Sequence, residues 1–358
     1  MNDPDMDEFL ASCEVPGVVA MGINATDTLY EGAFGMANTA TGESLTLDTP
    51  HALFSMTKPI TSFAIMQLME QGKVDLHEPV NRHIDFAPDL LVDVNLEKKT
   101  WRAQQPAREI TIHDLLTNTA GLGYAFCNPI LNAFLPESNR TRFGLVHQPG
   151  EAWTYSTGTQ VLGEVIQAVT GNSLEAALTD MIFTPLGMAN TSYEPRSDQA
   201  RAHRRGDNGW EPQDLFPRME IGDAGLIAPA GDYARFLRCL LNDGAPLLKP
   251  DTFTAMIRNQ IGELFITEQP ACQPGFALAF PTGDGVDKFG YGFQIHLQPP
   301  AGMRSPGSYS WCGVANTYFW GDPVKKVGGI VLMQVLPLYE PVCLQTLNGF
   351  EARFYDML

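Results

Sequence analysis

The spacing of apolar residues changes along the chain and separates strand-like from helix-like segments. Two short apolar runs at 17–23 and 29–34 flank turn-forming residues at 24–27, which predicts an N-terminal β-hairpin. In the middle of the chain the spacing is helical and predicts helices at 55–71, from 111 onward, and at 161–169, 173–182 and 232–241. Thr111 and Asp114 have the spacing of a capping box at the start of the second of these. Nearer the C-terminus the pattern predicts strands at 291–297, 316–320 and 329–336, followed by a helix at 342–355.

This order of elements predicts an α+β fold whose sheet is assembled from both ends of the chain. We expect residues 1–60 and 220–358 to form the sheet region and residues 61–219 to form a mainly helical region. The active site would then lie in the cleft between the two regions. The stretches 195–218 and 269–285 have neither periodicity and are interpreted as loops.

The helix predicted at 55–71 carries apolar residues too densely for an exposed helix, so we expect it to be buried. Gly72 stands where a helix C-cap belongs. Pro59 would break the interior of a helix but is tolerated in the first turn, where the missing N–H has no partner. The helix must therefore begin close to Ser55.

Composition narrows the classes of function. The 358 residues are 44% hydrophobic, enough for a large core, and carry a net charge of -18. Nucleic acids and anionic membrane surfaces would repel such a chain, so we expect neither as a partner. The sequence has no run of eighteen apolar residues, an acidic N-terminus and six cysteines without a Cys-x-x-Cys pair. These features predict a cytoplasmic protein with free thiols; the number of subunits is left open.

Ser55-Met56-Thr57-Lys58 is the only place in the sequence where a lysine follows a serine by three residues. At helical spacing the two side chains share one face, and a helix N-terminus aims its backbone N–H groups at the serine. Burial would weaken the affinity of Lys58 for its proton, which makes a lysine a base near neutral pH. These residues therefore fit a nucleophile and its base, and they fit equally well an N-cap serine followed by a surface lysine.

Two further segments can complete such a site. Tyr155 begins the run Tyr-Ser-Thr-Gly, and contact with a lysine ammonium would let its phenol ionise more readily and relay a proton. On its own, a tyrosine is more often a packing residue. Trp311 and Gly313 precede an aromatic strand, and the backbone N–H of Val314 could join that of Ser55 in an oxyanion hole.

Together these motifs resemble those of the serine β-lactamase-like proteins of the class C type, which are related to penicillin-binding proteins. The resemblance runs from about Val15 to the C-terminus and includes the segments 51–59, 66–76, 115–122, 155–158 and 185–188. It implies a β-lactamase/transpeptidase-like fold, an antiparallel sheet flanked by helices plus a mainly helical region. It also implies that Ser55 is the acylated nucleophile, that Lys58 and Tyr155 share the acid–base work, and that 311–314 form an edge-strand motif.

Two departures from the class C pattern bear on the substrate. Those enzymes carry Tyr-x-Asn, whose amide holds the β-lactam side chain, and Lys-Thr-Gly, whose cation attracts the β-lactam carboxylate. Here Thr157 replaces the asparagine, and Trp311-Cys312-Gly313 offers no charge. The resemblance implies that Thr157 and Trp311 contact the substrate at these two places. Trp-x-Gly at this place looks like the family VIII carboxylesterases and the acyltransferase that completes lovastatin-type statins. The resemblance therefore implies a carboxylesterase with room for acyltransferase activity, acting on a small-molecule ester and needing no cofactor or metal.

The sequence lacks the motifs of other hydrolase classes. An α/β-hydrolase would need Gly-x-Ser-x-Gly, and a zinc protease would need His-Glu-x-x-His; the sequence contains neither motif. A β-lactamase or D-Ala peptidase-type amide hydrolase remains an alternative within the same superfamily. So does a catalytically inactive relative that binds or senses a ligand.

Overall fold

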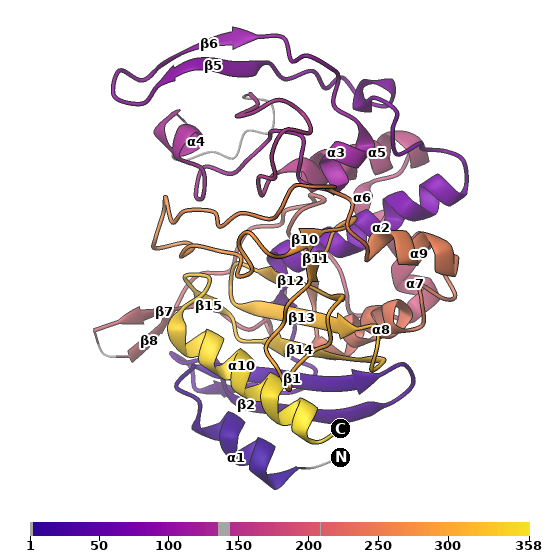
Figure 1. The fold of residues 1–358 in the computed structure, drawn as a ribbon. Coiled ribbons are helices and arrows are strands. Elements are labelled where there is room, and N and C mark those ends of the chain that lie inside the picture. Colours follow the sequence, from indigo (N-terminus) through magenta and orange to yellow (C-terminus); the bar gives the residue numbers. More distant parts are fainter. Residues whose placement is uncertain (1–2, 135–143, 208) are drawn as a thin grey trace.

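The computed structural model describes residues 3–134, 144–207 and 209–358 and is organised around an eight-stranded antiparallel sheet (Figure 1). The strands, in spatial order, are β10 (Lys288–Phe289), β11 (Gln294–His296), β12 (Ser308–Gly313), β13 (Thr317–Asp322), β14 (Val327–Leu332), β1 (Gly17–Asn24), β2 (Thr28–Asn38) and β3 (Glu43–Ser44). β1 and β2 form the predicted hairpin, and β1 also pairs with β14 from the other end of the chain, with Val19 opposite Leu332. The prediction that the sheet is assembled from both ends is confirmed.

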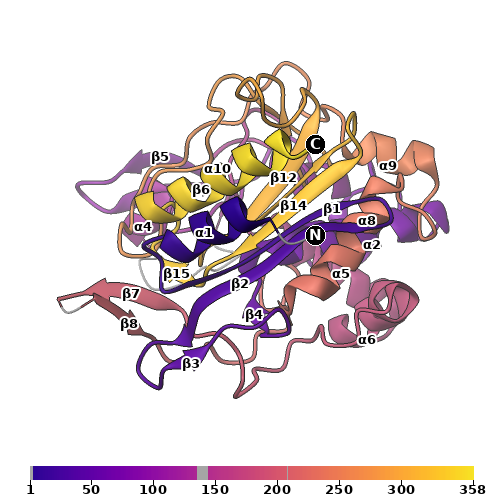
Figure 2. The ribbon, with the colours of Figure 1, turned by 90° about the horizontal axis from the view of Figure 1, so that it is seen from below.

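Helices cover both faces of this sheet (Figure 2). α1 (Pro4–Ser12) and α10 (Pro341–Asp356) lie on one face, and α8 (Ala230–Leu241) lies on the other. Glycines in the central strands let the helices approach closely. A Cβ at Gly22 would lie 2.2 Å from the ring of Phe354 in α10, and one at Gly328 would lie 3.0 Å from Leu237 in α8. The core therefore consists of two layers, one on each side of the sheet.

The remaining helices include the long helix α2. They are η1 (Phe54–Met56), α2 (Thr57–Glu70), η2 (Val80–Arg82), α3 (Ile112–Leu116), α4 (Pro129–Phe134), α5 (Gly158–Thr170), α6 (Leu174–Leu178), the π-helical turn η3 (Thr179–Phe183), α7 (Thr184–Leu186) and α9 (Pro250–Met256). The first twelve residues of α2 are all buried, as the dense apolar pattern predicted. Gly72, with a φ of +69°, follows its C-terminus, and Pro59 lies in its first turn.

Smaller sheets account for the main differences from the predicted elements. They are formed by β4 (His51–Ala52) with β9 (Ile227–Ala228), β5 (Leu90–Asn95) with β6 (Thr100–Gln104), and β7 (His203–Gly206) with β8 (Gly209–Pro212) and β15 (Val335–Leu336). The interpretation of 195–218 as a loop is wrong, because β7 and β8 form a hairpin there. This hairpin is polar. It is stabilised by parallel pairing of β7 with β15 and by the guanidinium of Arg205, which lies over the ring of Trp210. Neither contact requires alternating apolar residues in the sequence, so the strands could not be recognised from the pattern.

Two predicted strands are shorter than expected. The segment 291–297 forms only β11, because Gly292 adopts a φ of +92° that breaks the extended backbone before it. The segment 329–336 divides into β14 and β15 at Gln334, whose φ is +53° and whose amide donates to the carbonyl of Ala52 at 2.8 Å. In both places a turn inside an apolar run interrupts the strand.

Over the described residues, no helix combines the length and apolar character needed to cross a bilayer. The six cysteines all lie within those residues and are unpaired.

Candidate active site

A strained turn presents Ser55 at the start of α2. The preceding residue, Phe54, has a φ of +47°, a conformation that costs energy for a bulky residue and persists only where its surroundings enforce it. Its ring packs edge-on against Phe216, with centroids 4.9 Å apart, and the N–H of Leu53 donates to the carbonyl of Leu226 at 2.8 Å. The half-buried Ser55 thus sits in a 3₁₀ turn whose backbone is fixed on both sides.

Lys58 lies one turn further on and is 3% exposed. Its Nζ is 3.4 Å from the Oγ of Ser55 and also donates to the phenol of Tyr124 at 2.8 Å and to the main-chain carbonyl of Asp223 at 3.0 Å. Burial lowers the pKa of Lys58 to about 8, although the carboxylate of Asp223, 3.8 Å away, acts to raise it. A lysine in this state can take up a proton near neutral pH.

Tyr155 reaches the same hydroxyl from the helical side. Its phenol donates to the Oγ of Ser55 at 2.6 Å, and the Nζ of Lys58 lies 4.9 Å from its ring centroid. The rings of Phe280 and Trp311 pack against it, with centroids 5.3 and 5.1 Å away. The expectation that contact with the lysine would favour ionisation of the phenol is wrong in direction, because burial raises the pKa of Tyr155 well above its usual value. The phenol is therefore neutral.

Asn118 holds the segment that carries Tyr155. Its φ is +58°, and its side-chain oxygen accepts from both the N–H and the hydroxyl of Ser156, at 3.1 and 2.9 Å. Its carbonyl accepts from the N–H of Thr154 at 2.9 Å. The residues on either side of Tyr155 are thus fixed to one asparagine, a role that the sequence did not indicate.

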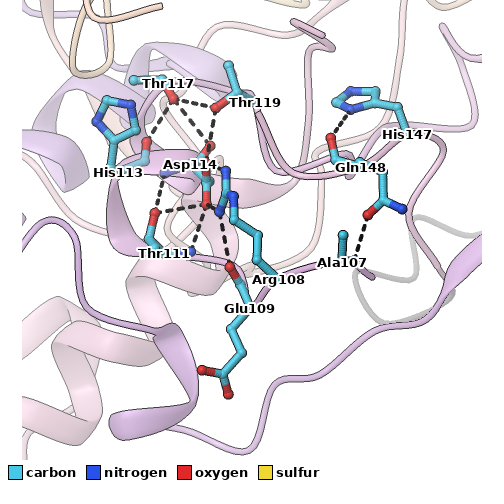
Figure 3. A network of polar contacts seen from close by, with 10 residues as sticks. All are labelled: Ala107, Arg108, Glu109, Thr111, His113, Asp114, Thr117, Thr119, His147 and Gln148. Carbon is cyan, nitrogen blue, oxygen red and sulfur yellow. Dashed lines mark hydrogen bonds and ion pairs between the residues drawn. The ribbon is translucent and has the colours of Figure 1, made fainter. Parts of the chain in front are cut away.

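A polar network in turn fixes the segment that contains Asn118 (Figure 3). Asp114 in α3 accepts two hydrogen bonds from the guanidinium of Arg108, at 2.6 and 2.8 Å, and one from the N–H of Thr111 at 2.8 Å. Thr111 accepts in return from the N–H of Asp114, which completes the capping box that the sequence suggested. Burial would raise the pKa of Asp114, but these hydrogen bonds outweigh it and lower the pKa. The network anchors the N-terminal end of α3, and the N–H of Thr119, which donates to the carbonyl of Asp114 at 3.0 Å, ties the segment after the helix to it.

β12 approaches the turn that carries Ser55. A Cβ at Gly313 would lie 2.2 Å from the carbonyl oxygen of Leu53, so only glycine permits this approach. The resemblance implied that β12 is an edge strand. That prediction is wrong, because β10 and β11 lie beyond it in the sheet. β11 pairs only with residues 308–310 of β12, however. Trp311 and Gly313, which lie nearer the turn of Ser55, therefore do not pair with β11. This half of β12 is a local edge, and Val314 follows it directly and is buried.

Thr157, the other residue predicted to contact substrate, occupies the N-cap position of α5. It is 1% exposed, and its Oγ has no hydrogen-bond partner among the described residues.

Sequence reasoning missed two residues that contact Lys58. The phenol of Tyr124 makes a very short hydrogen bond to the Oδ2 of Asp223, and burial raises the pKa of Tyr124 well above its usual value. The carbonyl of Gly222 accepts from the hydroxyl of Thr61 in α2 at 2.7 Å, which holds Asp223 beside the helix. Tyr124 follows the 115–122 motif and could have been suspected from it, whereas no local signal marked Asp223.

Comparison with known proteins gives this arrangement a context. A family model described as Beta-lactamase matches residues 3–353. The chain belongs to the beta-lactamase family. Within it, the chain is 28% identical over 386 residues to monacolin J acid methylbutanoyltransferase of Aspergillus terreus, an alignment covering 96% of this chain and 92% of that protein. It is 27% identical over 376 residues to the lovastatin esterase of Penicillium rubens, covering 92% of each.

Solved structures of this family share the fold. The unliganded selenomethionyl form of simvastatin synthase from Aspergillus terreus superposes with a TM-score of 0.86 at 25% identity, covering 100% of this chain and 99% of that one. The β-lactamase/transpeptidase-like fold predicted from the sequence is confirmed. Relatives within the beta-lactamase family thus include both an acyltransferase and an esterase.

Proposed function

We propose that the protein is a serine carboxylesterase that forms an acyl-enzyme on Ser55 and can pass the acyl group to water or to a second alcohol. The observation that carries the proposal is the position of the Oγ of Ser55, 2.6 Å from the phenol of Tyr155 and 3.4 Å from the amine of Lys58. A nucleophile within reach of both a base and a proton donor is the arrangement that acyl transfer requires. The acyltransferase and the esterase among its relatives support the same chemistry.

In the proposed mechanism, neutral Lys58 takes the proton of Ser55 as the Oγ forms a bond to the ester carbonyl carbon. A pKa of about 8 leaves an appreciable neutral fraction of Lys58 near pH 7.5. When the carbon–oxygen bond to the alcohol breaks, the phenol of Tyr155 donates its proton to the leaving alkoxide, and the ammonium of Lys58 restores it. Water or another alcohol then attacks the acyl-enzyme by the reverse sequence.

The negative charge on the carbonyl oxygen would rest on the backbone N–H groups of Ser55 and Val314. The close contact of Gly313 with Leu53 supports this assignment, because it brings the end of β12 to the turn of Ser55. A single donor of this kind is typically worth about 3 kcal/mol of activation barrier. We further propose that the site lies in the cleft between the sheet region, 1–60 and 220–358, and the helical region, 61–219.

The surroundings of Tyr155 favour neutral esters over β-lactams. The rings of Trp311 and Phe280 pack against it, and Phe126 stacks on Phe280, so an aromatic wall stands beside the nucleophile. Trp311 takes the place of a cation that would attract a carboxylate, and Thr157 that of an amide that would bind a β-lactam side chain. An apolar acyl group or alcohol therefore fits better than an anionic lactam.

The decisive experiment compares steady-state hydrolysis of p-nitrophenyl acetate and butyrate with that of nitrocefin. We expect rapid ester turnover, at most feeble nitrocefin cleavage, and loss of roughly 10³-fold or more in ester kcat for Ser55→Ala. Labelling with a serine-reactive phosphonate, diethyl p-nitrophenyl phosphate, should modify Ser55 in the unaltered protein. Efficient nitrocefin hydrolysis would favour the amide hydrolase instead, and an unlabelled Ser55 would favour the inactive relative.

A further inference from the structure

A second pocket lies between the sheet and α10. It encloses about 430 Å³, a volume that suits a small organic ligand. Much of its lining is apolar, contributed by Met303, Trp320, Tyr339, Leu344 and Leu347. Ser55, Lys58 and Tyr155 are not among the described residues that line it, although Trp311 of the proposed active site is, so the two sites adjoin across β12.

Three polar residues in this pocket form a connected chain. The Nε2 of His296 is 2.7 Å from the hydroxyl of Ser310, and its Nδ1 is 2.9 Å from the Oδ2 of Asp287. All three residues line the pocket, and Ser310 is partly exposed. Because side chains alternate along a strand, Ser310 in β12 points to the face opposite that of Trp311, which packs on Tyr155.

The hydrogen-bond partners determine which nitrogen of His296 carries the proton. Asp287 also accepts from the amide of Gln294 at 2.8 Å and from the N–H of Leu297 at 3.0 Å. Burial would raise the pKa of Asp287, but hydrogen bonds, first that from His296, lower it, so the carboxylate is ionised. An ionised carboxylate only accepts, so Nδ1 of His296 is the donor, and Nε2 accepts from the hydroxyl of Ser310 at 2.7 Å and, at 3.3 Å, from Nη1 of Arg304. Burial lowers the pKa of His296, which keeps the ring neutral.

A cation stands next to His296. The Nη1 of Arg304 lies 3.3 Å from the Nε2 of His296, and its other guanidinium nitrogens pair with the carboxylate of Glu351, with Nε 2.8 Å from Oε1. Arg304 and Glu351 are 12% and 3% exposed at their side chains. The ion pair holds the guanidinium in the pocket, where it can stabilise negative charge that develops on a carbonyl oxygen bound at Ser310. With Glu351 and Asp287 both present, the pocket favours a neutral ligand over an anion.

We propose that Ser310 is a second nucleophile, activated by His296 and Asp287, which accepts the acyl or phosphoryl group of small neutral esters bound in this pocket. The Oγ of Ser310 forms a bond to the electrophilic carbon or phosphorus, and its proton passes to Nε2 of His296. The bond to the leaving alkoxide or phenoxide then breaks, and that oxygen takes the proton from His296. A serine that contacts a histidine, which in turn contacts an aspartate, is the arrangement that activates serine in hydrolases of several unrelated folds.

The position of Ser310 within the sheet limits its rate. It is paired with Gln294 on one side and Trp320 on the other, so its backbone belongs to the ladder and provides no second oxyanion donor. We therefore expect Ser310 to be acylated or phosphorylated more slowly than Ser55 and to release the group slowly.

The test uses Ser55→Ala, which removes the first nucleophile and leaves the pocket intact, and the probe diethyl p-nitrophenyl phosphate. We expect one equivalent of adduct by intact mass and its location at Ser310 by peptide mapping. The adduct should be absent in Ser55→Ala/Ser310→Ala, and Ser55→Ala/His296→Asn should label at least about 100-fold more slowly. Ser308→Ala in the same background is the matched control, since Ser308 lies on the same strand face, is buried and has no hydrogen-bond partner for its hydroxyl among the described residues.

The result that overturns the proposal is an unmodified Ser310 in Ser55→Ala after times that label Ser55 fully in the unaltered protein. Labelling of Ser310 that His296→Asn leaves unchanged, in a variant with an unaltered melting temperature, overturns the role of the histidine. The two proposals are read separately. The adduct at Ser55 in the unaltered protein reports on the proposed function, and the adduct at Ser310 in Ser55→Ala reports on the second site.

Discussion

Replacement of Asp223 by asparagine should move the pH dependence of ester hydrolysis, because its carboxylate acts on the charge of Lys58. The two charged groups are 3.8 Å apart and almost fully buried, with 3% and 4% of their side chains exposed. Two unit charges 4 Å apart interact by about 1 kcal/mol in water and about 4 kcal/mol at an effective dielectric of 20. Since one pKa unit corresponds to about 1.4 kcal/mol, the pKa of Lys58 should fall by about 1 to 3 units from its value of about 8.

Asparagine removes the charge and little else. Its side-chain oxygen can still accept from Tyr124, and the main-chain carbonyl at this position, which accepts from Lys58 at 3.0 Å, is unchanged. The sign follows from the role of Lys58 as a base in its neutral form. The kcat/KM of the unaltered protein should rise with pH with a midpoint near 8, and the midpoint for Asp223→Asn should lie about 1 to 3 units lower.

The measurement is the pH profile of kcat/KM for p-nitrophenyl butyrate between pH 5.5 and 9.5. Glu220→Gln is the matched control, because it removes a carboxylate from the same segment. That carboxylate pairs with Arg218 and does not contact Lys58. Its profile should match that of the unaltered protein. A midpoint for Asp223→Asn that stays in place or moves upward would refute the electrostatic reasoning.

Three other substitutions test the site and its support. Tyr155→Phe should lower ester kcat by about 10² to 10⁴-fold with little change in KM, and a loss below threefold would contradict its role as proton donor. Gly313→Ala should reduce kcat at least about tenfold, because its Cβ would clash with the carbonyl of Leu53; unaltered kinetics would show that β12 does not position the oxyanion hole. Thr111→Ala should lower the free energy of unfolding in urea by about 1 kcal/mol and leave activity per folded molecule unchanged; a loss above about 3 kcal/mol would mean that more than a cap is lost.

The parts of the fold that were predicted correctly are those in which local pattern decides the structure. The N-terminal hairpin follows from two apolar runs around a turn, and the start of α2 near Ser55 follows from the backbone chemistry of Pro59. The capping box of Thr111 and Asp114 likewise depends on residues three apart.

What could not be predicted depends on contacts between distant segments. Asp223 meets Lys58 beside α2, where the carbonyl of Gly222 accepts from Thr61, and no property of the residues around it indicates that approach. The hairpin of β7 and β8 depends on pairing with β15, more than a hundred residues later. The interpretation of β12 as an edge strand failed because β11 pairs with residues 308–310 of it, and alternation over 291–297 predicts a strand without indicating which strand it pairs with.

The pairing of β1 with β14 has a consequence for how the protein is made. β1 leaves the ribosome early, but its second neighbour, Val327–Leu332, is synthesised about 300 residues later. At 5 to 20 residues per second this interval is roughly 15 to 60 s, during which one side of a strongly apolar strand has no partner. An unpaired strand of this kind is a template for association with other nascent chains. Added chaperones that shield exposed strands should therefore increase the yield of folded protein more than they would for a fold completed from neighbouring segments.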